Sequence, residues 1–439
     1  MALLHPASVP ATLPELNLFD LPPTQTAVDS IYYVETRPVS QVNCSNGPVE
    51  FCFGGESRDY IDLSRSRMKV KVQIIQEVGT PLVAKELAVP VNLALHSMWS
   101  QVDVTLGGRL MSQATGLYPY KSMIQTLLNF DSESKTTQLV GQGFYKDEKT
   151  GMDSVIVGKN DAVFAKNELF SMSKTVDFEG PLLEDVLQLK RHLLNNIEVG
   201  VKLYPSQSSF LIMAADTTKK YKMKLVEASF KVCMVRVSPG ITLGHAHALE
   251  TRNALYPYTN CETKTYSIPK DSSSVNIDNV FQYTRPSKLV FGLVSAEAFN
   301  GSFTKNPFNF KHYGVTDVAV VVDGETIPGR PLKLDFASTT GRDYITPYLH
   351  MFEATGTLGM NVGNGITPED FANGQTLFVF NLDPQAKKGK YLNLIRRANV
   401  RIELRFASPL IETVNIIVYA EHPALIEVDK VRNVMNVRH

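Results

Sequence analysis

The sequence has 439 residues, of which 44% are hydrophobic and 20% are charged. This length exceeds one ordinary hydrophobic core and suits two domains of roughly 200 residues each, and the composition excludes a chain that is disordered throughout. Lys+Arg and Asp+Glu both number 44, and this balance argues against sequence-specific nucleic acid as a partner because neutralising many phosphates normally requires a basic excess.

The beginning of the chain is predicted to be an extended arm. Prolines recur between His5 and Pro23 and block both helices and central strands. Period-two alternation takes over after this arm, as is typical of a half-buried antiparallel strand. One side of the first long strand carries Met68, Val70, Val72 and Ile74, and the other carries Lys69, Lys71 and Gln73.

A second strand, a turn and a helix follow in the first half. Val102, Val104 and Leu106 alternate with polar residues before the turn Gly107-Gly108. The segment "YPYKSMIQTLL", residues 118–128, has helical spacing. The polar stretch 131–173 shows weak patterning and is predicted to be an elaborated loop. Strands then resume in "NIEVGVKLYP" and "YKMKLVEASFKVCMVRV", and "SPG" at residues 238–240 ends the last one.

The second half repeats this order. Val318, Val320 and Val322 take the place of Val102, Val104 and Leu106 at a shift of 216 (318 minus 102), and Asp323-Gly324 takes the place of the turn. "GRDYITPYLHMF" replaces the helix, although Pro347 is expected to shorten or kink it. "NNIEVGVKLYPS" and "ANVRIELRFASP" are twin strands at a shift of 203 (399 minus 196). Four markers in the same order indicate duplication.

The predicted fold class is all-β, with two tandem jelly-roll β-sandwiches that carry short helices and long loops. The predicted divisions are an extended N-terminal arm at 1–30, a first jelly roll at 31–239, a second jelly roll at 240–427, and a C-terminal tail at 428–439.

The cysteines and the N-terminal sequence indicate the cellular compartment in which the protein is made. None of the cysteines forms a CxxC pair, which predicts free, buried thiols in a reducing compartment: Cys44, Cys52, Cys233 and Cys261. No signal peptide and no run of 18 apolar residues is present, so we expect synthesis in the cytosol and no membrane span. The glycosylation sequons at Asn43 and Asn300 are then interpreted as chance matches.

The strongest candidate for chemistry is "GHAHALE". On an extended backbone His245 and His247 would share a face with Glu250 nearby, and cupin enzymes, which are jelly rolls, bind metal through a similar pattern. The spacing from His247 to Glu250 is too short for that motif, and no second motif follows. The residues are therefore interpreted as polar linker residues rather than a metal site.

Other catalytic signals are weak. The sequence contains no GxSxG, HExxH, Walker or dinucleotide-binding motif, and the carboxylates Asp131 and Glu133 are typical of a solvated loop. The Leu-Tyr-Pro-Tyr repeats that begin at Leu117 and Leu255 are interpreted as packing or turn residues rather than a stacking platform. No catalytic residue, cofactor or metal ligand is predicted.

The chain resembles the major capsid proteins of Polinton (Maverick) elements and adintoviruses. The resemblance lies in "YIDLSRSRMKVKVQI", "SMWSQVDVTLGG", "YPYKSMIQTLL", "VDGETIPGRPLKLDF" and "YITPYLHMF". It is of general character over most of the chain, and it is weakest in the arm and in the loop from Asp131.

The resemblance implies a structural protein without enzymatic activity. Three copies would form a hexon-like homotrimer whose six jelly rolls tile a pseudo-hexagonal lattice in an icosahedral shell. Residues 1–30 and 428–439 would be free to reach neighbouring subunits, and a minor capsid or penton protein would be a second partner. The protein would be made in the host cytoplasm and located in the virion, and assembly in the nucleus stays open. The alternatives are a bicupin-like metalloenzyme and a carbohydrate- or host-binding β-sandwich such as a spike or penton.

Overall fold

A computed structural model describes residues 5–39, 47–84, 86–156, 158–281, 284–337, 342–383 and 394–437. The predicted sequon at Asn43 and the thiol of Cys44 lie outside these residues.

The first half of the chain forms two facing antiparallel sheets. One has the order β1 (Val28–Thr36), β10 (Tyr221–Val237), β3 (Asp59–Gln76) and β7 (Val176–Gly180). The other has the order β2 (Val49–Gly54), β8 (Glu198–Pro205), β5 (Trp99–Leu106) and β6 (Arg109–Leu110). The predicted alternation in β3 is confirmed, because the residues expected on the inner side are fully buried in the core: Met68, Val70, Val72 and Ile74.

The second half builds the same pair of sheets. One has the order β11 (Ala254–Ile268), β18 (Val414–Val428), β13 (Lys288–Ser295) and β16 (Leu377–Asn381). The other has the order β12 (Ser274–Ile277), β17 (Val400–Phe406), β14 (Val315–Val322) and β15 (Glu325–Lys333). If these eight strands of each half are numbered in chain order, both halves have the sheet orders 1-8-3-6 and 2-7-4-5. This is jelly-roll connectivity, and it confirms the predicted all-β class with two tandem jelly rolls.

Short elements decorate the rolls. The added strands are β4 (Ala88–Pro90), which pairs with β9 (Ile212–Ala214), and β19 (Val434–Val437). The short helices include α1 (Ala94–Ser97), α5 (Ser208–Leu211), α7 (Ala296–Asn300) and α9 (Pro368–Ala372), with the 3-10 turns η1 (Pro14–Leu16) and η4 (Asp185–Gln188).

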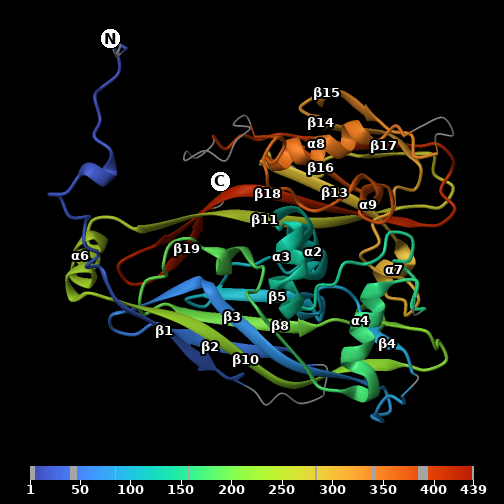
Figure 1. Cartoon of the computed structure of the whole chain (residues 1–439), viewed down its shortest axis with the longest axis horizontal. Coiled ribbons are helices and arrows are strands. Elements are labelled where there is room, and N and C mark those ends of the chain that lie inside the picture. The colour runs from blue at the N-terminus through green and yellow to red at the C-terminus, as the bar shows by residue number, and fades with distance from the viewer. Residues whose placement is uncertain are drawn as a thin grey trace.

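The rolls are stacked, and both face the same way (Figure 1). The sheet of β1, β3 and β10 lies at one end of the stack, followed by the sheet of β5 and β8, then α2 (Tyr118–Asn129), then the sheet of β11 and β18, and finally β14 and β17. Helix α2 contacts β5 of its own roll and β18 of the second roll. One continuous hydrophobic core therefore runs through both rolls.

Each roll carries a helix between its fifth and sixth strands. Helix α2 confirms the predicted helix, and its counterpart α8 (Ile345–Thr355) has 11 residues against 12 in α2. Pro347 does not shorten α8 as expected. It is the third residue of the helix, where a backbone N–H would have no intrahelical partner in any case.

The prediction of a loop over 131–173 is wrong in part. This stretch contains α3 (Ser132–Thr136), η2 (Gln138–Gln142), α4 (Asp161–Phe170) and η3 (Ser171–Ser173). Side chains cap both α-helices, since Asp131 accepts a hydrogen bond from the Ser134 amide and Asn160 accepts one from the Ala162 amide.

The register of the twin strands corrects the predicted shift. Val104 of β5 lies opposite Val201 of β8, and Val320 of β14 lies opposite Ile402 of β17. Since β5 and β14 both end at a two-residue turn, Val104 and Val320 are equivalent at the shift of 216. Val201 is then equivalent to Ile402, a shift of 201 (402 minus 201). The predicted 203 is wrong by two residues.

The ends of the chain differ from each other. Residues 5–27 are largely exposed and extend away from the body, while β1 begins at Val28, inside the predicted arm (Figure 1). In the predicted tail, β19 pairs with β18 from Val434↔Val428 to Val437↔Leu425. The expectation that the whole tail is free is therefore wrong. No helix in the described ranges is long and apolar enough to cross a membrane.

Candidate functional site

The candidate functional site is the junction between the two rolls, and α2 is its central element. Ten of the 12 residues of α2 are buried, because one side of the helix packs on the first roll and the other meets the second. Tyr118 and Pro119 begin the helix, and proline is favourable at this position because it needs no hydrogen-bonded N–H there.

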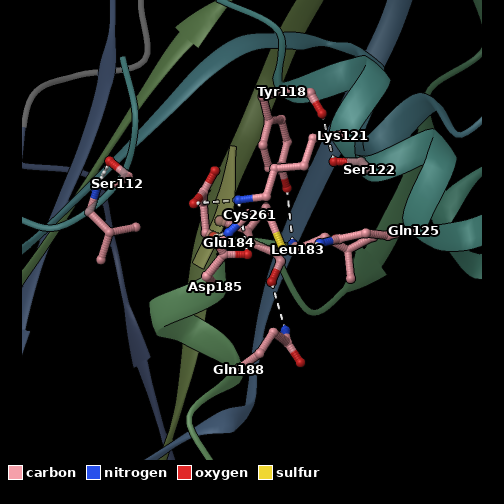
Figure 2. A network of polar contacts seen from close by, with 12 residues as sticks. Ser112, Tyr118, Lys121, Ser122, Gln125, Leu183, Glu184, Asp185, Gln188 and Cys261 are labelled. Atoms are coloured by element: carbon pink, nitrogen blue, oxygen red, sulfur yellow. Dashed lines mark hydrogen bonds and ion pairs between the residues drawn. The ribbon is translucent and has the colours of Figure 1, made fainter. Parts of the chain in front are cut away.

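A buried ionic network joins the rolls at Lys121 (Figure 2). The Lys121 Nζ atom lies 3.0 Å from Glu184 Oε2 and 3.1 Å from Asp185 Oδ1, and these three side chains are only 5–9% exposed. Asp185 Oδ2 also accepts a hydrogen bond of 2.7 Å from the backbone N–H of Cys261 on β11. One ammonium group thus connects α2 and η4 of the first roll to the first strand of the second.

The charges in this network perturb one another. Burial raises the pKa of Glu184 to about 7, against the opposing effect of the Lys121 ammonium. Burial alone would lower the pKa of Lys121, but the carboxylates of Asp185 and Glu184 outweigh it and hold that pKa above its ordinary value. The ammonium group therefore stays charged inside the protein.

Neutral hydrogen bonds continue the network along α2. Gln125 Nε2 donates to the Tyr419 hydroxyl at 3.2 Å and lies 3.5 Å from Cys261 Sγ, and that sulfur lies 3.0 Å from the same hydroxyl. A pocket of about 10 Å³, lined by Cys261, Lys121 and Glu184 among others, has room for about one water molecule. Since ligand pockets measure roughly 300–1,000 Å³, this pocket does not have the size of a substrate site.

An aromatic cluster closes the junction beside the ionic network. Tyr120 of α2 stacks on Phe299 of α7 with ring centroids 5.7 Å apart, and it makes edge contacts with Phe308 and Phe310 of the second roll and with Phe210 of the first. Such pairs contribute roughly 0.5–1.5 kcal/mol each beyond the burial of their area.

A second polar clamp uses the stretch predicted to be a loop. Asp153 accepts hydrogen bonds of 2.9 Å from the Asn306 backbone N–H and from the Asn309 side chain, and it forms an ion pair of 2.9 Å with Lys311. Lys146 reaches Asp370 at 2.6 Å. The connection between the fifth and sixth strands of the first roll therefore holds the second roll in place.

The histidines singled out in the sequence do not form a shared site. They lie on the linker helix α6 (Pro239–Leu249), not on extended backbone, and two residues on a helix point about 200° apart. His245 Nδ1 is hydrogen-bonded to the Tyr60 hydroxyl at 2.9 Å, whereas His247 is 85% exposed and lies 3.4 Å from the Glu250 carboxylate. The described ranges contain no cluster of three side chains that could hold a metal.

The other residues weighed from the sequence have packing or capping roles. Asp131 is the N-cap of α3, and Glu133 lies in the first turn of that helix. The two Leu-Tyr-Pro-Tyr repeats open α2 and fall within β11, so both belong to the junction. Among the described cysteines, Cys233 and Cys261 are buried free thiols as expected, while Cys52 is exposed.

Sequence reasoning missed the junction itself. Glu184 and Asp185 lie 63 and 64 positions after Lys121 in the chain (184 minus 121 and 185 minus 121), and no local pattern connects them. A lysine within a helix of mainly apolar and aromatic residues was the available signal, because burying a charge is costly unless it is paired.

At the level of sequence, a relative covers nearly the whole chain. The sequence matches no protein-family profile. An uncharacterized protein of Caenorhabditis elegans is 28% identical over 429 residues, which is 94% of this chain and 98% of that protein.

Several solved viral structures are similar in fold, with low sequence identity. The TM-score is 0.66 for a chain of the Sputnik virophage, which is 11% identical, with coverage of 98% of this chain and 94% of that one. It is 0.59 for the PBCV-1 virus capsid, which is 10% identical, with coverage of 96% and 99%. It is 0.56 for the mavirus major capsid protein, which is 10% identical, with coverage of 99% and 96%. The chain therefore has the double jelly-roll fold of these viral structures.

Proposed function

We propose that the chain is the major capsid subunit of an icosahedral virus-like shell, in which three copies form a hexon-like capsomer. The observation that carries the proposal is the stacking of two equivalent rolls in the same orientation. Two similar rolls in each chain let three chains present six rolls, and such a trimer can occupy hexagonal lattice positions.

The junction supports this function because it makes the pair of rolls one rigid unit. A capsomer must keep its outline while it packs against neighbours, and the buried network at Lys121 and the aromatic cluster at Tyr120 both resist hinge motion between the rolls. Similarity in fold over nearly the whole mavirus major capsid protein and the PBCV-1 capsid chain supports the same role.

The finer assignments belong to this proposal. The segments quoted above favour an origin in a Polinton (Maverick) element or an adintovirus. The protein would be made in the host cytoplasm and reside in the virion, without enzymatic activity, and a minor capsid or penton protein would complete the vertices. Residues 31–239 and 240–427 would be the two rolls, and the exposed residues 5–27 would contact neighbouring subunits.

The oligomeric state of the purified full-length protein tests the proposal. Size-exclusion chromatography with light scattering should give a mass of three chains at micromolar concentration, and electron microscopy should show hexagonal capsomers or closed particles. A stable monomer under these conditions would contradict the capsid function.

A further inference from the structure

The two rolls protect the edges of their sheets in several ways. An unpaired edge strand presents backbone N–H and C=O groups to any other strand, so folded proteins cover, shorten or interrupt such strands. Strands β6 and β12 have only two and four residues, and β15 contains the prolines Pro328 and Pro331. In β2 the Glu50 carbonyl accepts a hydrogen bond of 2.8 Å from the Val39 amide.

Three further edge strands contact neighbouring segments. The N–H of Cys261 in β11 donates to Asp185 Oδ2 of the first roll at 2.7 Å. His350 Nδ1 of α8 lies 2.9 Å from the carbonyl oxygen of Val379 in β16, and η2 packs against β7. The first strand of the second roll, β11, therefore has an occupied edge, and so do the sixth strands of both rolls.

The first strand of the first roll, β1, lacks this protection. It has nine residues, with no proline and no lysine or arginine. Its side chains Ile31, Tyr33 and Val34 are 39–47% exposed. Among the described residues, which leave out 40–46, only β10 forms backbone hydrogen bonds to the stretch from Asp29 to Thr36. A long apolar edge of this kind is a site for pairing with another strand.

The register shows which residues of β1 direct their backbone groups to the free edge. The Cys233 N–H of β10 donates to Ser66 Oγ of β3 at 3.0 Å, so it points away from β1. Tyr33 lies opposite Cys233, and in an antiparallel ladder such a pair directs the groups of both residues outward. The direction alternates along a strand, so Ile31 and Glu35 also present their N–H and C=O groups to the free edge.

Residues 17–21 of the arm have a matching character. They are extended, and they lie between the 3-10 turn η1 and Pro22. Their apolar side chains Leu18, Phe19 and Leu21 are 75–95% exposed. The segment contains no proline, so each of its residues can donate a backbone hydrogen bond. Its five residues equal the length of β1 from residue 31 to residue 35.

The arm leads away from its own β1. Gln25 fixes the entry into that strand, since its Nε2 donates to the Val28 carbonyl at 3.0 Å and its Oε1 accepts from the Val28 amide at 2.8 Å. The Ala27 carbonyl accepts a hydrogen bond of 2.9 Å from the Ser238 amide. Beyond this point the arm extends away from the body (Figure 1), and residues 22–27 can span roughly 20 Å. The arm therefore carries residues 17–21 toward a neighbouring molecule.

We infer that residues 17–21 of one copy add as a strand to residues 31–35 of β1 in a copy that belongs to a neighbouring capsomer. This inference rests on the proposed function and names the surfaces that join its capsomers. The free backbone groups of β1 supply the hydrogen bonds, and the apolar side chains of the arm are buried on the added strand. Each copy carries one free edge and one arm segment, so every edge has a partner in the lattice.

The first experiment identifies the neighbour of the arm in particles of the full-length protein. Phe19 is replaced by the photocrosslinker p-benzoylphenylalanine, and the particles are assembled from a mixture of unlabelled and isotope-labelled chains. Mass spectrometry should find residue 19 joined to a peptide of β1, with both isotopic forms in one product. The control has the same probe in place of Val9, which is 83% exposed in the same arm, and should give no crosslink to β1.

The second experiment blocks the free edge. Ile31→Pro removes an N–H that points away from β10, and proline is tolerated at such a position of an edge strand. The variant should keep the trimer and the unfolding temperature but yield fewer particles. Val34→Pro is the matched comparison. It removes an N–H that points toward β10, because Val34 alternates with Tyr33, and should lower the unfolding temperature.

The outcomes separate this inference from the proposed function. A crosslink from residue 19 that stays within one chain, or that reaches only peptides outside β1, would overturn the inference and leave the capsid subunit standing. An unchanged particle yield in Ile31→Pro would do the same. A wild-type protein that stays monomeric and forms no particles would overturn both. Crosslinks to β1 between the two isotopic forms would support the inference, and they decide it even if Ile31→Pro does not fold.

Discussion

At the scale of single residues, the ionic network of the junction is built around Lys121, a buried cation. Lys121 pairs with two carboxylates, and among the residues that the structure describes neither Glu184 nor Asp185 forms an ion pair with another cation. Taking two ions out of water costs several kcal/mol per ion, and their mutual attraction offsets that cost only while both partners are present. The loss of one partner therefore matters more than the net contribution of the pair.

We expect Lys121→Met to lower the free energy of unfolding by about 3–5 kcal/mol, because it leaves Glu184 and Asp185 buried without their cation. Urea unfolding followed by circular dichroism measures the loss. The control is Lys71→Met, which removes one partner of a surface ion pair whose side chains are 41% and 55% exposed, and it should change stability little. Equal losses of unfolding free energy in the two variants would show that the buried network contributes no more to stability than the surface ion pair.

At the scale of elements, the duplication left equivalent helices in unlike environments. Helix α2 is enclosed between two sheets, while α8 has only three buried residues among its 11. Protection of backbone amides follows the free energy of local opening, which is greater for an enclosed helix than for a half-bare one.

Hydrogen exchange read by mass spectrometry should show this contrast directly. Peptides that cover α8 should exchange faster than peptides that cover α2, because most residues of α8 are not buried. Equal protection of the two helices would contradict a difference in local stability between them.

Much of the element structure could be predicted from the sequence, and the failures have physical reasons. Alternation in β3 and β5 reflects burial of one sheet face, so it identified the fold class. The same alternation could not determine the shift of the twin strands, because a displacement of two residues keeps every side chain on its face. Helices α3 and α4 were missed because they are short and weakly amphipathic, although Asp131 and Asn160 were readable caps.

At the scale of the whole molecule, the N-terminal arm and the body are separate. Residues 5–27 contribute no strand to either roll, whereas β1 pairs with β10 from Val28↔Val237 to Thr36↔Phe230. The predicted arm of residues 1–30 thus includes the beginning of a sheet strand, so a truncation that removes only the arm has to end before Val28.

Deletion of residues 1–27 should leave the thermal unfolding temperature and the trimer unchanged and should reduce the yield of assembled particles in electron microscopy. Deletion of residues 1–36 is the matched comparison, because it also removes β1 and exposes the edge of β10. This longer deletion should lower the unfolding temperature or abolish soluble protein. If the shorter deletion also did so, the arm would be part of the folded body.

The linker helix α6, which joins β10 to β11, has a consequence for the dependence of assembly on protein concentration. It makes every second contact between rolls in the proposed ring intramolecular, and such a contact forms at an effective concentration fixed by the linker and not by the solution. Assembly of the ring then requires three chains to associate from solution, where separate rolls would require six, so it is less sensitive to dilution. The capsomer can therefore form early in synthesis, while its subunits are still scarce.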